Sequence, residues 1–171
     1  MEVWLGTPEE TPQVISAAKV IPHERFNNYT LDFDIMLLKL TQPAALNGCV
    51  QPISLPQQCA AAGTLCLTSE WGSNNLNRRD GPLQCSNLTI ASNAMCNNAY
   101  PGRFTERMLC AGQLDGGQDS CKGDVGSPLV CGDALQGLLS WNNSCSEENQ
   151  LGLYTKICAF GAWIHYTITN N

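Results

Sequence analysis

The chain has 171 residues and a net charge of −6, and its nine Lys and Arg residues form no basic stripe. This charge pattern excludes nucleic acid as an expected partner, and no apolar run is long enough to span a bilayer, so no membrane partner is expected. The length suits one domain or two small ones, with enough apolar residues for a core.

Short apolar runs bounded by Gly, Pro, Asn or Asp predict β-strands along most of the chain. In chain order these strands are Val14–Ile21, Ile35–Leu40, Thr64–Trp71, Leu83–Ile90, Leu129–Cys131, Leu135–Trp141 and Leu151–Ile157. Two stretches predict helices instead. One begins after Ser92, a good N-cap residue, and runs toward Tyr100, and the other runs from about Ala159 to Thr169. Many short strands with few helices favour an all-β barrel or sandwich.

The ten cysteines predict a disulfide framework formed in an oxidising compartment. A cytosolic metal site is the alternative. It is disfavoured because the chain has no Cys-x-x-Cys pair, and neither of its two histidines lies at zinc-ligand spacing from a cysteine pair. No metal and no cofactor are therefore expected.

The amino terminus conflicts with secretion. Met1-Glu2-Val3-Trp4 has no basic region and no apolar region, so it is not a signal peptide. Either the protein is made without one, or this chain is part of a longer precursor. Three acceptor triplets for N-glycosylation begin at Asn28, Asn87 and Asn142, and they matter only if the chain is secreted.

The nine residues from Gly123 to Cys131 are the most informative segment. They read Gly-Asp-Val-Gly-Ser-Pro-Leu-Val-Cys and resemble the segment that carries the nucleophile in trypsin-like serine proteases, Gly-Asp-Ser-Gly-Gly-Pro-Leu-Val-Cys. Val125 occupies the serine position. Valine has no heteroatom that could attack a carbonyl, so the motif lacks its catalyst.

The resemblance covers nearly the whole chain, from about Trp4 to Asn171. Further segments similar to the family follow in the family's order: Leu31–Leu40, Pro52–Pro56, Ser69–Gly72, Met108–Gly112, Asp119–Asp124, Gly137–Trp141 and Gly152–Lys156. The family has two six-stranded antiparallel barrels with the active site between them. The resemblance implies an all-β, chymotrypsin-like fold with a truncated first barrel, a complete second barrel and a C-terminal helix.

By the same resemblance, residues 1–62 form the partial first barrel and the inter-barrel connector, and residues 63–171 form the second barrel with its helix. Together they make one trypsin-like peptidase domain. The missing part is at the amino end and would hold the catalytic histidine and the mature amino terminus.

The mechanism of the family needs a serine, a histidine and an aspartate in mutual hydrogen-bond reach. Asp34 matches the aspartate and is the only retained triad position. His23 and His165 match no catalytic position, and both are expected on the surface. Ser127 lies two residues beyond the nucleophile position, too far displaced to substitute for it.

The resemblance also assigns binding positions. The substrate-binding positions are Asp119 at the pocket floor, Trp141, Asn142 and Gly152. Asn142 replaces a wall glycine and would narrow the entrance. The N–H groups of Gly123 and Val125 match the oxyanion hole.

Two further features depart from the family. Asp124 matches a carboxylate that pairs with the freed amino terminus, and without that partner we expect its loop to be rearranged or loosely ordered. The calcium loop is shortened to Gly6–Pro12, with prolines at potential ligand positions, so calcium is not expected.

The family pattern implies the disulfides Cys59–Cys158, Cys66–Cys131, Cys96–Cys110 and Cys121–Cys145. Cys85 matches a cysteine whose partner lies in the absent part. Cys49 has no partner in the common pattern. These two are free, paired with each other, or paired with missing sequence.

Three hypotheses remain open. The first is a secreted, catalytically inactive trypsin homologue that binds a protein or peptide ligand. The second is a serine endopeptidase with Lys/Arg specificity represented by an incomplete chain. The third is a truncated product that does not fold stably, because an opened barrel exposes strand edges. The oligomeric state is not predicted.

Overall fold

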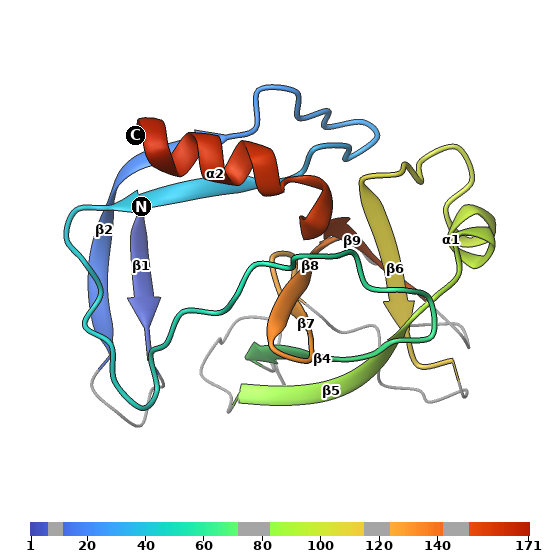
Figure 1. The fold of residues 1–171 in the computed structure, drawn as a ribbon, viewed down its shortest axis with the longest axis horizontal. Coiled ribbons are helices and arrows are strands. Elements are labelled where there is room, and N and C mark those ends of the chain that lie inside the picture. Colours follow the sequence, from blue (N-terminus) through green and yellow to red (C-terminus); the bar gives the residue numbers. More distant parts are fainter. Residues whose placement is uncertain (7–11, 72–82, 115–123, 142–150) are drawn as a thin grey trace.

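The computed structural model describes residues 1–6, 12–71, 83–114, 124–141 and 151–171 (Figure 1). Within them the chain is mostly strands, arranged as one three-stranded sheet and one closed barrel, with two α-helices. Figure 1 shows the sheet and the barrel side by side, joined by the long connector after β3. The division at residues 62 and 63 into two parts stays a prediction.

The three-stranded sheet is the truncated first barrel. Its strands are β1 (Glu2–Leu5), β2 (Gln13–Pro22) and β3 (Met36–Leu40), paired antiparallel in the order β1-β2-β3. Strands β2 and β3 were expected from the sequence, and β1 was not. The β2–β3 register shifts between Ala17 and Lys19, an irregularity that increases local twist.

The second barrel is complete, as the resemblance implies. Its strands are β4 (Leu65–Trp71), β5 (Leu83–Ile90), β6 (Met108–Gly112), β7 (Pro128–Cys131), β8 (Ala134–Trp141) and β9 (Gly152–Lys156). They close antiparallel in the order β4-β5-β6-β9-β8-β7, with β7 paired back to β4. Leu88, Leu129 and Tyr154 are among the buried side chains that fill the barrel, so closure leaves this half with no free edge.

The C-terminal helix holds the two parts together. Helix α2 (Gly161–Asn170) follows the short 3-10 helix Ile157–Ala159 and runs alongside β3 (Figure 1). Its buried Ile164 packs with Phe160, Ile157 and Ile35, and Leu37 of β3 joins this cluster. Burial of these apolar side chains therefore joins the end of the second barrel to the truncated first barrel.

Helix α1 (Asn93–Ala99) begins where the sequence predicts. The Ser92 hydroxyl accepts the Met95 backbone N–H at 3.3 Å, so Ser92 is the N-cap. We expect Ser92→Ala to lower the free energy of unfolding by about 1 kcal/mol, because an N–H of the first turn loses its partner. Urea unfolding followed by circular dichroism measures the change. Ser92→Thr is the matched control and should keep most of the stability; an alanine variant as stable as the threonine variant would contradict the capping role.

Three of the four implied disulfides are present: Cys59–Cys158, Cys66–Cys131 and Cys96–Cys110. The fourth pair, Cys121 and Cys145, lies outside the described residues. Cys85 on β5 is exposed and has a free thiol, and Cys49 in the connector is also exposed. Within the described ranges, no helix has the length and apolar character needed to cross a membrane.

Candidate active site

Asp34 lies at the junction between the two parts of the fold. It lies two residues before β3 yet is bonded to the second barrel. Its carboxylate accepts the Ser140 hydroxyl at 2.6 Å, and its backbone carbonyl accepts the Thr155 hydroxyl at 2.7 Å. Ser140 on β8 and Thr155 on β9 are both buried. A carboxylate that accepts a hydrogen bond from a buried hydroxyl is held in one orientation. Asp34 is therefore fixed between the sheet and the barrel, and its match to a triad aspartate stays a prediction.

The backbone that carries Asp34 is bent at two unusual positions. Leu31 and Phe33 have φ values of 62° and 60°, a left-handed conformation that is costly for bulky side chains. Such strain persists only where surrounding contacts fix the segment. Here the contacts are made by Asp32, which lies between Leu31 and Phe33 in the chain.

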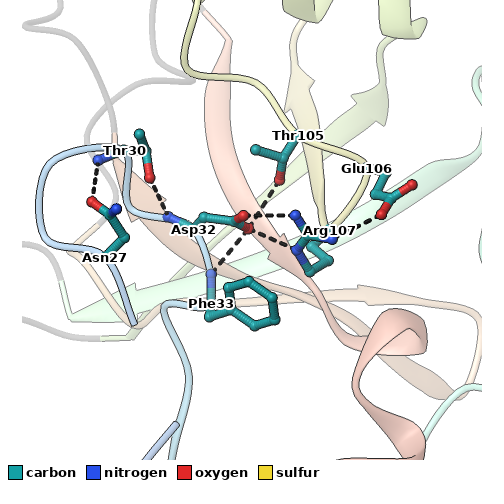
Figure 2. Close-up of polar contacts among 7 residues, drawn as sticks. All are labelled: Asn27, Thr30, Asp32, Phe33, Thr105, Glu106 and Arg107. Atoms are coloured by element: carbon teal, nitrogen blue, oxygen red, sulfur yellow. Dashed lines mark hydrogen bonds and ion pairs between the residues drawn. The ribbon is translucent and has the colours of Figure 1, made fainter. Parts of the chain in front are cut away.

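Asp32 anchors this segment to the second barrel through Arg107, which directly precedes β6 (Figure 2). The Arg107 guanidinium donates from Nε to Oδ1 at 2.9 Å and from Nη2 to Oδ2 at 2.7 Å. The Thr105 hydroxyl and the Phe33 N–H also donate to Oδ1, at 3.0 and 3.1 Å. Two parallel bonds from one guanidinium add geometric specificity as well as energy. We call these contacts the Asp32–Arg107 latch.

The latch makes stability depend on pH. Partial burial raises the pKa of Asp32, but hydrogen bonds from Arg107 and Thr105 outweigh it, so the pKa of Asp32 is lowered from 3.8. A carboxyl with a lowered folded-state pKa contributes stability above its unfolded pKa, and this contribution is lost as pH falls through the folded-state value.

We therefore expect Asp32→Asn to lower the free energy of unfolding near neutral pH and to reduce its decline between about pH 4 and pH 2. Urea titrations across that range measure both effects. The control is Glu106→Gln, since Glu106 also bonds Arg107 but is exposed, and it should change stability little. Equal effects of the two variants would show that the latch carries no special stability.

His23 corrects one expectation from the sequence, because it is buried rather than on the surface. Its ring packs against Phe33 at 4.7 Å, Trp163 at 4.8 Å and Phe160 at 5.6 Å between centroids. Its Nδ1 accepts the Arg25 backbone N–H at 3.1 Å. The aromatic cluster formed with α2 covers it, and this places His23 in the packing between the two parts. His165, in contrast, is exposed on α2 as expected.

Val125 lies at the tip of a turn that is tied to β8. The Ser127 N–H donates to the Asp124 carbonyl at 2.9 Å, and the Gly126 N–H donates to the Leu139 carbonyl at 2.7 Å. Gly126 has a φ of +95°, which a glycine adopts without strain. The Val125 side chain is 67% exposed. The position that resembles the nucleophile therefore presents an isopropyl group to solvent.

The two neighbours of Val125 that carry oxygen differ in burial. Ser127 is buried at the base of the turn. Asp124 is exposed, and its backbone N–H donates to a Glu70 carboxylate oxygen at 3.1 Å. The cost of burying an unpaired Asp124 carboxylate, which motivated the expected rearrangement, therefore does not arise at this residue. The rest of the expected loop change concerns residues before 124, outside the described part.

The structure describes two of the predicted substrate-binding positions, Trp141 and Gly152. Trp141 ends β8 and is paired with Leu153 of β9 in the ladder. Gly152 begins β9, and a Cβ placed there would lie 2.8 Å from Cε2 of Tyr154 and 3.1 Å from Cδ1 of Leu139. Close packing against a buried tyrosine ring is thus a reason for glycine here besides an open pocket wall. Asp119, Asn142 and Gly123 lie outside the described residues, so their predicted roles stay predictions.

The described ranges contain no group of three or more His, Cys, Asp or Glu side chains placed to hold a metal ion. The absence of a metal or cofactor from the whole protein stays a prediction.

The comparisons with known proteins agree with this fold. The family model described as Trypsin matches residues 1–164. A trypsin of Xenopus laevis is 52% identical over 98% of this chain and 70% of its own length. Trypsin of Sus scrofa is 48% identical over 95% of this chain and 71% of its own length, and Trypsin-1 of Salmo salar is 47% identical over 99% and 73%. The chain therefore belongs to the trypsin family of serine proteases.

Proposed function

We propose that this chain is a catalytically inactive member of the trypsin family that acts outside the cell by binding a protein or peptide. The single observation that carries the proposal is Val125. An exposed side chain of carbon atoms alone occupies the position that the resemblance matches to the family's nucleophile, and it can neither lose a proton nor form an acyl-enzyme.

The surroundings of Val125 offer no replacement within the described residues. Ser127 is the adjacent hydroxyl, but it is buried at the base of the turn. A general base must lie within hydrogen-bond reach of the proton it abstracts. The two histidines have other surroundings: His23 packs in the aromatic cluster with its Nδ1 accepting the Arg25 N–H, and His165 is exposed on α2.

Binding is supported by the two apolar side chains exposed beside the junction. The turn that carries Val125 is hydrogen-bonded to β8, and Trp141 ends that same strand. Exposed aromatic residues next to a rigid strand supply contact area at low entropic cost, and tryptophan is enriched among the residues that dominate binding energy. An extracellular location is supported by the three disulfides, which persist in oxidising compartments.

Steady-state hydrolysis tests the loss of catalysis. The purified chain and Sus scrofa trypsin are compared on a small Lys or Arg ester. We expect turnover at least about 10⁵-fold below that of trypsin, because loss of the serine or histidine of a triad alone costs about 10⁶-fold. Turnover within about a hundredfold of trypsin would overturn the proposal and favour a Lys/Arg-specific endopeptidase.

A matched pair of tryptophans tests binding at the junction. Trp141 is 41% exposed beside the site, and Trp71 is 43% exposed at the end of β4. Fluorescence anisotropy with labelled Lys- and Arg-containing peptides should detect a complex that Trp141→Ala weakens at least about tenfold, while Trp71→Ala leaves it unchanged. Equal weakening by both variants, or no complex with any peptide, would contradict peptide binding at this face.

A further inference from the structure

The outer face of strands β4 and β5 exposes two leucines close together. Leu65 is 62% exposed and Leu67 is 44% exposed, while Cys66 between them is buried. This alternation places Leu65 and Leu67 on the outside of the barrel. Neighbouring exposed leucines on a strand are a liability for aggregation unless something covers them. We call Leu65 and Leu67 the leucine pair.

An acceptor triplet for N-glycosylation lies directly opposite the leucine pair. In the β4–β5 register, Leu67 faces Asn87 and Leu65 faces Thr89. Asn87 is exposed, and Leu88 between the two is buried in the barrel core. Asn87 and Thr89 therefore point outward on the same face as the leucine pair, with Cβ atoms of opposed residues about 5 Å apart.

We propose that Asn87 carries an N-linked oligosaccharide that covers the leucine pair. In the transfer, the Asn87 side-chain nitrogen attacks the anomeric carbon of a lipid-pyrophosphate-linked oligosaccharide. An N–C bond forms, the bond from that carbon to the pyrophosphate oxygen breaks, and the amide nitrogen loses one proton. The lipid pyrophosphate leaves, with no change of oxidation state.

The outward direction of Asn87 makes the attachment compatible with the folded barrel. The modification adds a bulky, solubilising group and requires a surface position. A glycan at Asn87 leaves the barrel core intact and begins about one strand spacing from the leucine pair. The triplet at Asn28 provides a matched comparison, because Asn28 is also exposed but lies in the turn before Asp32, away from β4 and β5.

The proposal of an oligosaccharide on Asn87 rests on the extracellular location proposed above. The test therefore directs the chain into the secretory route. The full chain is expressed in cultured insect cells behind a cleavable signal peptide, and protein from the endoplasmic reticulum and from the medium is analysed separately. The glycans are removed from the peptides by peptide N-glycosidase in ¹⁸O-labelled water. We expect ¹⁸O-labelled aspartate at position 87 in both pools, absent in Thr89→Ala and retained in Asn28→Gln. Unmodified Asn87 in material from the endoplasmic reticulum would overturn the attachment, whatever happens to secretion.

Covering of the leucine pair has a separate readout. Enzymatic removal of the glycan from the folded protein should increase binding of an apolar fluorescent dye and self-association in sedimentation. The same treatment of Leu65→Thr/Leu67→Thr should cause no increase. An unchanged dye signal after deglycosylation of the unsubstituted chain would show that the glycan does not cover this face.

Discussion

Val125→Ser is expected to leave the chain without trypsin-like turnover, at least about 10⁵-fold below trypsin on a Lys or Arg ester. A serine hydroxyl is a weak nucleophile until a base takes its proton. Asp34 accepts a hydrogen bond from Ser140, and His23 is packed elsewhere with its Nδ1 already accepting a bond. Loss of the histidine alone costs about 10⁶-fold in turnover, so restoring one triad member gains little.

The folding control for this variant is direct. Position 125 is largely exposed at the tip of its turn, so the substitution should change the free energy of unfolding by less than about 0.5 kcal/mol. An inactive variant with unchanged unfolding supports the missing base as the reason. Activity within about a hundredfold of trypsin in the same variant would show that the chain holds a base that the described residues do not reveal.

Removal of the Cys59–Cys158 disulfide is expected to cause the largest loss of stability among the three disulfides in the described part of the chain. The two cysteines are 99 residues apart, and closing a loop of that length stabilises a fold by about 4.7 kcal/mol through the entropy of the unfolded chain. The bond joins the connector to the 3-10 helix that precedes α2. Domains of this size are stable by only about 5–15 kcal/mol, so Cys59→Ser/Cys158→Ser should lose about a third or more of the stability of the fold.

Urea unfolding of the oxidised protein measures this loss. Cys59 and Cys158 are not part of the buried core, so their substitution removes little packing and isolates the effect of loop closure. Cys85→Ser is the matched control, since it changes an exposed free thiol and should cost less than about 0.5 kcal/mol. A double variant as stable as the control would mean that noncovalent contacts, such as the packing of α2 and the Asp32–Arg107 latch, are enough to hold the two parts together.

Most strands of the barrel could be predicted from sequence, because their apolar residues alternate with polar ones or because turn residues bound them. Strand β6 could not, since all five of its residues are buried and no period of two remains. Strand β1 has only four residues, too few for a pattern. The motif around Val125 predicted a match to the nucleophile position, but it predicted neither the turn that carries Val125 nor the exposure of its side chain.

The contacts that position Asp34 could not be predicted from the sequence, because their partners are far apart in the chain. Asp32 and Arg107 are 75 residues apart, and nothing local marks either as a partner of the other. The same holds for His23, which is covered by Phe160 and Trp163 from the far end of the chain. The expectation that His23 lies on the surface came from the resemblance, which does not place these distant aromatic residues around it.

The central claim is that the chain has no activated nucleophile, and covalent labelling tests it most directly. The purified, folded chain and Sus scrofa trypsin are incubated with a fluorophosphonate that reacts with activated serines, and intact masses are measured. We predict one adduct per molecule on trypsin and none on this chain. A stoichiometric adduct on any serine of this chain, Ser127 above all, would contradict the account.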